Sequence, residues 1–397
     1  MGKTTTFGDA RRATEKGPAI SQVESACEVP AAWKRSLAKK LLRWFKAHQR
    51  DLPWRRSADP YAVWISEIML QQTQVSTVIP YFNRFLAAFP TVAHLAAADE
   101  HAVLRLWEGL GYYRRARQMH RAAQVIVAEH GGKFPRSLAE VNSLPGVGRY
   151  TAGAIVSIAY DQPAPILEAN TVRVFSRLAA YSGETASSAG QKFLWNLAEA
   201  VVPAKDCGAF NQSLMELGSL VCTPRNPNCE ACPVSQECAA FQSGRQQQIP
   251  HVRVKPPSEA VHEAAVVVYH RGQLLVRRRA ASERWAGMWD FLRFPLEFPL
   301  EASTDHARLK NRALEIAGKV RDQSGIAIGE PRSLTTLKHG VTRFRITLDC
   351  YAATARSKKT TLPASEWQWI DPAELRHLAL SMTGRKLADL LLSSPAL

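Results

Sequence analysis

Apolar side chains recur at helical spacing along the first part of the chain. One such run places apolar residues on a single face, with lysine and arginine on the others, at Trp33, Leu37, Leu41 and Trp44. The same period returns at residues 61–73, 172–178 and 210–221. Because no strand-like alternation is evident before residue 240, the pattern predicts an all-helical domain over residues 31–240, preceded by a disordered tail at residues 1–30.

The pattern changes after residue 240. A basic, glutamine- and proline-containing stretch at residues 241–260 predicts a linker. Two β-rich runs, Ala264–Tyr269 and Leu274–Arg278, then flank Arg271-Gly272, which indicates a hairpin. Residues 344–350 alternate between apolar and polar, and a helix is indicated by Leu309, Ala313, Ile316 and Val320. We therefore expect a second, α+β domain over residues 261–397.

Composition narrows the class of partner. Hydrophobic residues make up 46% of the chain and charged residues 22%, but the net charge is +16. This basic balance favours an anionic polymer or an anionic membrane surface, and an indifferent basic surface has the same composition. Because no apolar run reaches transmembrane length and the polar N-terminus lacks the core of a secretory signal, we expect no membrane association and a reducing compartment.

Four of the seven cysteines stand close together near the end of the helical region, at Cys222, Cys229, Cys232 and Cys238. Four thiols in so short a stretch indicate a metal centre in a reducing compartment. Ligand chemistry alone allows zinc or an iron–sulfur cluster. We expect the remaining cysteines to be free thiols, at Cys27, Cys207 and Cys350.

Glu67 is the only acid in the helical run 61–73, and it is flanked by Ile65, Ile68 and Met69. A carboxyl in apolar surroundings has a raised pKa and can hold a proton near neutrality. The alternative is a solvated glutamate on the wet face of a helix, which is the commoner situation. Further along, residues 109–117 interleave aromatics with arginines at a turn, a pattern that suits either DNA contacts or a basic helix start.

The segment Leu144-Pro145-Gly146-Val147-Gly148 predicts a tight turn, because two glycines bracket one apolar residue. An apolar helix follows, so the turn presents backbone N–H groups at a helix N-terminus, where phosphate binds readily. Glu168 and Asn170 then follow two helix-breaking prolines. An ordinary helical turn and a solvated glutamate explain each feature in isolation.

Together these motifs carry a family resemblance. The run Leu-Pro-Gly-Val-Gly-x-x-Thr-Ala resembles the helix-hairpin-helix of the endonuclease III superfamily of DNA glycosylases. Within it, the chain is similar to the MutY-type adenine DNA glycosylases from about Trp33 to Cys238, and more loosely to the C-terminus. The resemblance implies a helix-hairpin-helix at about residues 140–160, a [4Fe–4S] cluster in the loop 222–238, and a MutT-like (Nudix-like) domain for mismatch recognition. The acidic Nudix signature is missing around residues 319–325, so little remains there to hold Mg²⁺.

The resemblance also implies roles for individual residues. Excision of a base requires that it be flipped out and protonated, and that a cationic sugar be stabilised. By the resemblance, the catalytic residues are Glu67 as the acid, Glu168 near the sugar, and Tyr150 and Asn170 in support. The adenine pocket matches Trp54, Arg55 and Gln212. DNA contacts match the wedging side chains Gln72 and Tyr112, the phosphate-gripping Gly146, Val147 and Gly148, and, in the C-terminal domain, Thr342 and Arg343.

One position distinguishes members within the superfamily, and two segments depart from the family pattern. Lyase-competent members carry a lysine where this chain has Tyr150, and a phenol cannot form a Schiff base. The family's Asp-Gly-Asn reads Glu168-Ala169-Asn170, which keeps the charge but adds a methylene. The Phe-Ser-His segment that reads 8-oxoguanine reads Val341-Thr342-Arg343, following His339. Tyr150, which matches the family position, favours a monofunctional glycosylase.

The sequence therefore predicts a monofunctional adenine DNA glycosylase that acts on adenine mispaired with 8-oxoguanine or guanine in duplex DNA. We expect a monomer that is cytoplasmic and nucleoid-associated, assuming a bacterial source. One alternative is an endonuclease III-like glycosylase and lyase acting on another damaged base, against which Tyr150 and the second domain argue. The other is a DNA lesion-binding protein with impaired catalysis, which the unusual Glu168 suggests.

Overall fold

The computed structural model describes residues 29–251, 257–297, 306–341, 343–358, 363 and 365–393. They form two compact units. Within these residues, the first unit covers 29–67, 135–143 and 147–251, and the second covers 68–134, 144–146, 257–297, 306–341, 343–358, 363 and 365–393. Apart from Val29 and Pro30, the expected tail at residues 1–30 and its Cys27 lie outside the described residues.

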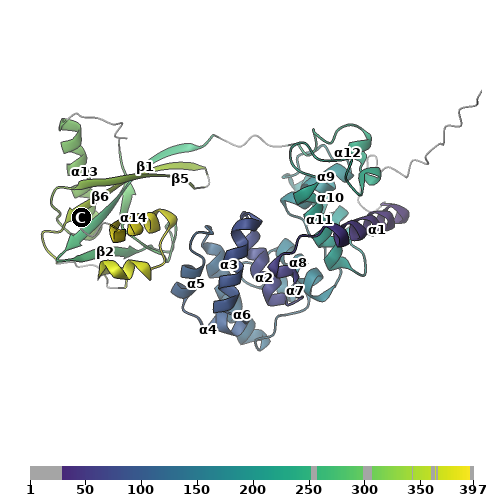
Figure 1. The fold of residues 1–397 in the computed structure, drawn as a ribbon, viewed down its shortest axis with the longest axis horizontal. Coiled ribbons are helices and arrows are strands. Elements are labelled where there is room, and N and C mark those ends of the chain that lie inside the picture. The colour runs from purple at the N-terminus through teal and green to yellow at the C-terminus, as the bar shows by residue number, and fades with distance from the viewer. Residues whose placement is uncertain are drawn as a thin grey trace, which may run out of the picture. The chain divides into compact units, whose positions relative to one another are not determined.

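The described part of the first unit is helical, as its periodicity predicts. Its helices, drawn in purple to teal in Figure 1, are α1 (Ala31–His48), η2 (Pro53–Arg55), α2 (Pro60–Leu70, whose end belongs to the second unit), α7 (Leu138–Ser143), α8 (Arg149–Tyr160), α9 (Ala169–Leu178), α10 (Ser188–Val201), α11 (Cys207–Leu220), η3 (Ser235–Glu237) and α12 (Ala239–Gln242). Their shared core joins Leu37 and Leu41 of α1 to Phe175 of α9 and Phe210 of α11. Burial of this apolar face holds the helices together.

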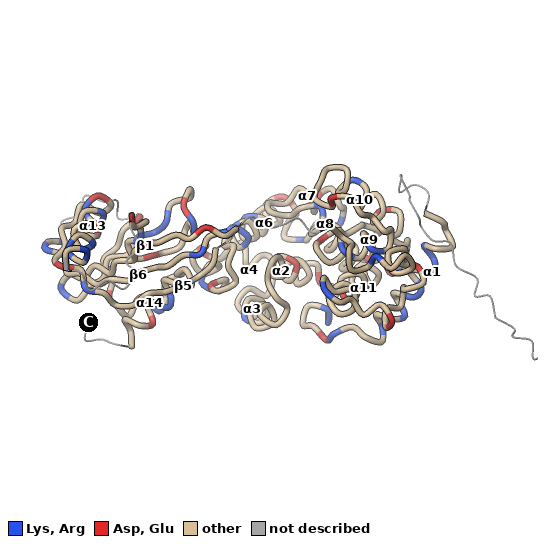
Figure 2. The backbone as a smooth tube through the Cα atoms, turned by 90° about the horizontal axis from the view of Figure 1, so that it is seen from above, with Lys and Arg blue, Asp and Glu red and all other residues tan. Residues whose placement is uncertain are grey.

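The apolar face of α1 is confirmed and is one position wider than predicted. Trp33, Leu37, Leu41 and Phe45 are buried, whereas Trp44 is half-buried, packs against the same core and stacks on His48 with ring centroids 5.3 Å apart. A period of 3.6 residues brings position 45, four after Leu41, back to the buried face. Lysine and arginine, blue in Figure 2, mark the other faces of α1, which contains no acidic residue.

The second unit combines helices with a mixed sheet. Its first helices are α3 (Val75–Ala88), α4 (Val92–Ala97), α5 (Glu100–Leu106) and α6 (Arg114–His130). The sheet strands are β1 (Glu259–His270), β2 (Gln273–Arg278), β3 (Trp289–Asp290), β4 (Leu292–Pro295), β5 (Arg332–Val341), β6 (Phe344–Thr354) and β7 (Trp367–Ile370). Three further elements accompany the sheet: α13 (His306–Ser324), η4 (Pro372–Arg376) and α14 (Met382–Ser393).

The strand order is β3-β2-β1-β6-β5, with β4 also paired to β1 and β7 to β2. Strands β1 and β6 run parallel, with Ala265 opposite Cys350, and the other pairs are antiparallel. Alternate residues of β1 face opposite sides, so the sheet is buried on both. Helix α13 covers one face and α14 the other (Figure 1).

Two details correct the sequence analysis. Leu309 was expected on the apolar face of α13, but its side chain is 47% exposed, and the buried positions of that helix include Ile316 and Val320 together with Arg312. The predicted linker 241–260 is structured at both ends. Ile249 is buried, its carbonyl accepts a hydrogen bond from Arg177 Nε, and β1 already begins at Glu259. Among the described residues, no helix is long and apolar enough to cross a membrane.

Candidate active site

Glu67 lies in the last turn of α2 and is 6% exposed. The prediction of an acid in apolar surroundings is confirmed, because Trp64, Ile65, Ile68 and Met69 are also buried. Burial raises the pKa of Glu67 to about 7. The hydrogen bond from Tyr150 and the charge of Arg55 act in the opposite direction, while the charge of Glu168 raises this pKa further. A protonated carboxyl is therefore available near neutral pH.

Tyr150, in the first turn of α8, holds this carboxyl. Its hydroxyl donates to Glu67 Oε2 at 2.6 Å and lies 3.3 Å from the sulfur of Met215. Burial and the nearby carboxyl of Glu67 raise the pKa of Tyr150 well above its usual value, so the phenol stays a donor. Since Oε2 accepts this bond, Oε1 is the oxygen that carries the proton of Glu67.

Glu168 is the N-cap of α9. Its Oε2 accepts from the backbone N–H of Asn170 at 2.8 Å and its Oε1 from that of Thr171 at 3.0 Å, while Thr171 Oγ1 accepts from the backbone N–H of Glu168 at 2.7 Å. This reciprocal pair is a capping box, worth about 1 kcal/mol at a helix terminus. Burial raises the pKa of Glu168, and the backbone N–H donors oppose that rise. Glu168 and Asn170 thus occur together as predicted, with the carboxylate fixed by the helix.

Glu216 on α11 was not among the residues predicted from the sequence. Its carboxylate is buried and accepts from Arg50 Nε at 2.8 Å, Arg50 Nη2 at 2.7 Å and Arg55 Nη2 at 2.9 Å. Burial alone would raise the pKa of Glu216, but the two guanidinium groups outweigh it and hold the pKa at about 2. A single acid in an apolar helix, the signal that drew attention to Glu67, would also have found Glu216.

The residues matched to the adenine pocket lie on η2 and α11, which the ion pair of Arg55 with Glu216 joins. Trp54 and Arg55 lie on η2, where Trp54 is buried. Gln212 lies one helical turn before Glu216 on α11 and is half-buried. Arg55 is also fixed by a bond from its Nη1 to the Arg50 carbonyl at 3.2 Å and by the ring of Phe45 beneath it. The roles of Trp54, Arg55 and Gln212 toward adenine stay predictions.

The predicted hairpin turn connects α7 and α8. Gly146 has a φ of +75°, and a Cβ at this position would lie 2.5 Å from Gln118 Cβ, so glycine is required there. Gly148 is the N-cap of α8 and supplies no side-chain cap, while Val147 is buried. The first N–H groups of α8 are thus placed as a phosphate site requires.

The two residues predicted to wedge into DNA lie on separate turns of the second unit. Gln72 follows α2 with a φ of +56°, and Tyr112 precedes α6 with a φ of +48°. Both side chains are exposed, Tyr112 to 48%. The neighbouring Tyr113 is buried at the start of the basic helix α6, so the alternative of a basic helix start over a buried ring is also met, and the contact of Tyr112 with DNA stays a prediction.

The four loop cysteines lie between the end of α11 and the start of α12, and three of them pack against the helical core. Arg177 of α9 donates to Cys222 Sγ at 3.2 Å, which suits a thiolate. Among the described residues, no three His, Cys, Asp or Glu side chains converge as ligands of one metal ion. Four thiols in one loop are a donor set that an iron–sulfur cluster takes.

Side chains of α9 and α1 hydrogen-bond this loop to the rest of the first unit. Arg173 donates through Nε to the Cys222 carbonyl at 2.7 Å and through Nη2 to Asn170 Oδ1 at 2.9 Å. On the other side, Trp33 Nε1 donates to the Glu237 carbonyl at 3.2 Å and Lys40 Nζ to its carboxylate at 2.7 Å. One guanidinium therefore connects the candidate catalytic Asn170 to a cysteine of the loop, a link that no spacing in the sequence reveals.

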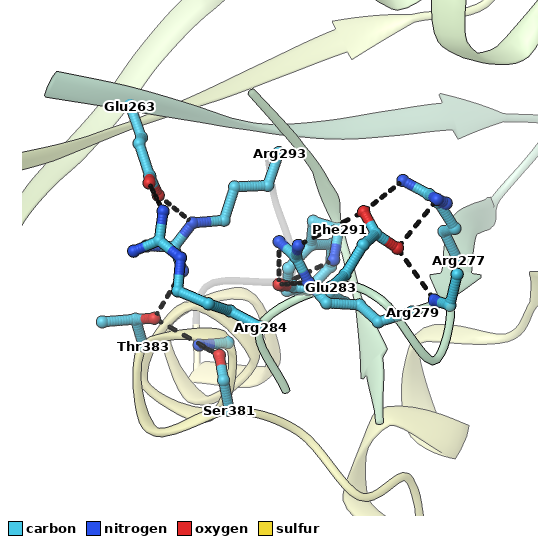
Figure 3. A network of polar contacts seen from close by, with 12 residues as sticks. Glu263, Arg277, Arg279, Glu283, Arg284, Phe291, Arg293, Ser381 and Thr383 are labelled. Atoms are coloured by element: carbon cyan, nitrogen blue, oxygen red, sulfur yellow. Dashed lines mark hydrogen bonds and ion pairs between the residues drawn. The ribbon is translucent and has the colours of Figure 1, made fainter. Parts of the chain in front are cut away.

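In the second unit, Thr342 lies outside the described residues, whereas Arg343 is exposed beside Glu259 with 3.4 Å between Nε and Oε1. A buried ion pair lies beside strand β5, which leads to this segment, and Figure 3 shows its two members, Glu263 and Arg293. Glu263 of β1 accepts from Arg293 Nε and, at 2.6 Å, from Arg284, and Arg293 Nη2 lies 3.3 Å from His339 Nε2. The predicted contacts of Thr342 and Arg343 with DNA stay predictions.

Comparisons with known proteins agree with this geometry. Three family profiles match: "HhH-GPD superfamily base excision DNA repair protein" at residues 65–199, "Iron-sulfur binding domain of endonuclease III" at 222–238, and "NUDIX domain" at 263–390. The adenine DNA glycosylase of Mus musculus is 44% identical over 228 residues, which span 55% of this chain and 44% of that protein. Those of Rattus norvegicus and Homo sapiens are each 34% identical, spanning 88% and 87% of this chain and 76% and 72% of the relative.

The helical fold, the hairpin and the cysteine loop define an HhH-GPD base excision repair protein with a C-terminal Nudix-like α/β domain. Within that class, the chain belongs to the adenine DNA glycosylase family. The match at residues 222–238 confirms a [4Fe–4S] cluster over zinc, with Cys222, Cys229, Cys232 and Cys238 as the residues that would hold it. When bound, the cluster cross-links the loop through iron–sulfur bonds.

Proposed function

We propose that this chain excises adenine mispaired with 8-oxoguanine or guanine from duplex DNA, and that it does so as a monofunctional glycosylase. The observation that carries the proposal is the buried Glu67 carboxyl, protonated near neutrality and held by the Tyr150 hydroxyl at 2.6 Å. Cleavage of an N-glycosidic bond needs a proton on the leaving base, and Glu67 Oε1 is the atom that supplies it. Membership of the adenine DNA glycosylase family supports this assignment.

The reaction also requires that the positive charge on the sugar be stabilised. As the bond to adenine breaks, the sugar becomes cationic and needs negative charge nearby. Glu168 supplies a carboxylate whose position is fixed by N–H groups of α9, and its charge reaches Glu67. Tyr150 has no amine, so it cannot form a Schiff base with the sugar and no lyase step is expected. We further propose that the protein acts as a monomer in the cytoplasm, on the nucleoid.

A single-turnover assay tests this function. Duplexes carrying adenine opposite 8-oxoguanine, guanine or thymine are incubated with excess protein, and strands are analysed before and after alkali. We expect adenine release opposite 8-oxoguanine and guanine only, with strands intact until alkali is added. Nicking without alkali, or a borohydride-trapped complex, would favour the endonuclease III-like alternative.

The lesion-binding alternative has one observation in its favour: both oxygens of the Glu168 carboxylate are engaged by the helix. If the wild-type protein binds adenine mispairs tightly but releases no base from any of them, the catalytic assignment fails and that alternative stands.

A further inference from the structure

One half-buried guanidinium joins the two turns that carry Gln72 and Tyr112. Arg115, in the first turn of α6, donates through Nη1 to the carbonyls of Ile68 at 2.8 Å and Met69 at 3.2 Å, and also to that of Gln71. Its Nη2 donates to the carbonyls of Leu110 and Gly111, each at 3.2 Å. Both ends of one planar group thus donate to backbone carbonyls, and Nη2 also donates to Thr73 Oγ1 at 3.4 Å.

The contacts on each side fall on specific backbone positions. On the first turn they cap the C-terminal carbonyls of α2, where the helix dipole favours a cation. On the second turn they fall on the two consecutive carbonyls that precede Tyr112. Trp107 Nε1 also donates to the second of these, the Gly111 carbonyl, at 3.1 Å. The guanidinium carbon lies 5.3 Å from the Trp107 ring centroid and 5.5 Å from that of Tyr112.

No carboxylate pairs with Arg115 anywhere in the described part of the chain. Burial lowers its pKa to about 10, so it remains charged at neutral pH. A half-buried charge compensated by carbonyls, the Thr73 hydroxyl and aromatic rings is costly unless those partners are held in place. Arg115 Nε has no hydrogen-bond partner among the described residues, and departure of either turn would leave the Nη donors without acceptors as well.

Both turns also hold a non-glycine residue in the left-handed region, Gln72 at +56° and Tyr112 at +48°. Such residues persist only where surrounding contacts over-determine the backbone, and they concentrate at functional sites. Here the over-determining contact is the same side chain for both. The contacts of Arg115 therefore fix the backbone from which the exposed side chains of Gln72 and Tyr112 project.

We propose that Arg115 is a positioning residue that builds these two turns into one preformed wedge for duplex DNA, with Gln72 and Tyr112 as its tips. This rests on the proposed function, since the wedge serves to extrude the target base. Inserting side chains between base pairs costs unstacking energy. A wedge that is already ordered adds no further loss of conformational entropy at that step.

The test separates base extrusion from chemistry. A duplex carries 2-aminopurine next to the target adenine, and stopped-flow fluorescence reports unstacking when protein is added. Arg115→Met keeps the side-chain stem but removes the donors, and Arg115→Lys keeps the charge without the planar fork. Arg114→Met is the matched control, because Arg114 is the exposed neighbour on the same turn of α6 and its loss removes an equal charge. Melting temperature and cluster absorbance verify that each variant folds.

We expect Arg115→Met to slow the fluorescence rise and single-turnover excision by about tenfold or more, with a smaller defect in Arg115→Lys. On a duplex whose target adenine is already unstacked by two flanking mismatches, the excision defect should largely disappear. Arg114→Met should weaken duplex binding in a salt-dependent way but leave the rate of base extrusion unchanged. If Arg115→Met does not fold, Arg115→Lys takes its place in both arms.

Wild-type extrusion rates in the folded Arg115 variant, or an equal excision defect on the pre-unstacked duplex, would overturn the proposal. The fluorescence arm does not need base release. If wild type extrudes the base but excises no adenine, the proposed function fails while the wedge is still judged by fluorescence. If wild type produces no unstacking on any mispaired duplex, the wedge itself is refuted.

Discussion

The hydroxyl of Tyr150 donates to Glu67 Oε2 across 2.6 Å, from α8 to α2. One oxygen of the carboxyl is thereby occupied, and the acidic proton is directed to the other. The same bond stabilises the ionised form, so it sets a limit on how far burial raises the pKa of Glu67. Two residues 83 positions apart thus define both the direction and the acidity of the candidate proton donor.

The pH dependence of excision should follow Glu67. With a pKa of about 7, Glu67 loses its proton as pH rises, so the single-turnover rate should fall above about pH 7. Glu67→Gln should lower the rate by about a hundredfold to ten-thousandfold with duplex affinity retained. Tyr150→Phe removes the bond that lowers this pKa, so the falling limb should move to higher pH. Tyr160→Phe, at the far end of α8, is the control, and an unshifted Tyr150→Phe profile would exclude the bond from this role.

Glu67 should also make stability depend on pH. Its pKa rises from 4.5 to about 7 on folding, so the protonated form stabilises the native state. That stability is fully present below pH 4.5 and is lost as pH rises through 7. Glutamine at position 67 does not titrate. Above pH 7 the free energy of unfolding of Glu67→Gln should therefore exceed that of wild type by up to about 3 kcal/mol, and the variant should unfold at a higher denaturant concentration. Denaturant unfolding at pH 5 and pH 8 measures this, and a pH-independent difference would contradict it.

Glu216→Gln should be destabilising by about 3–5 kcal/mol, because it leaves the guanidinium groups of Arg50 and Arg55 without their buried counter-charge. Arg55 already lowers the pKa of Glu67, and without Glu216 that effect should grow, so the falling limb of the pH profile moves to lower pH. Glu199→Gln is the matched control. It removes an exposed partner of Arg149, so its cost should stay below about 1 kcal/mol. Equal melting temperatures for the two variants would refute a special role for Glu216.

Glu168→Asp tests whether side-chain length matters at the α9 cap. Aspartate is a good N-cap residue and keeps the charge, so folding should change by less than about 1 kcal/mol. Because the helix N–H groups hold the carboxylate, we expect excision at or above the wild-type rate. Glu168→Gln keeps one capping oxygen but loses the charge, and should abolish excision with little change in duplex affinity. A fall in Glu168→Asp as large as that in Glu168→Gln would show that the longer side chain is required.

Arg173→Met should affect the active site and the cysteine loop together. It removes hydrogen bonds to Asn170, Gly218 and Cys222, and should cost about 2–3 kcal/mol of stability. We expect slower excision and faster bleaching of the visible cluster absorption. Arg225→Met, which changes an exposed arginine of the loop itself, should alter neither. Loss of excision with an unchanged bleaching rate would mean that Arg173 serves only Asn170.

The sequence by itself determined whatever depends on near neighbours in the chain. Helical periodicity located α1 and α2, the lone acid in an apolar run identified Glu67, glycine spacing identified the hairpin, and thiol spacing identified the cluster loop. Each is encoded within a few residues, because helix faces, turns and loop ligands are set by local geometry. The same locality explains the error at Leu309, where the helical period was read correctly but the extent of the buried face was not.

Only the tertiary structure decided which charges meet. Arg50 and Glu216 lie 166 positions apart, and Arg115 finds its acceptors 44 to 47 positions away as well as nearby. A guanidinium in a sequence carries no sign of whether water, a carboxylate or a ring of carbonyls will surround it. That depends on how the helices pack, and burial then makes each such pairing strong, because a low dielectric penalises every alternative arrangement.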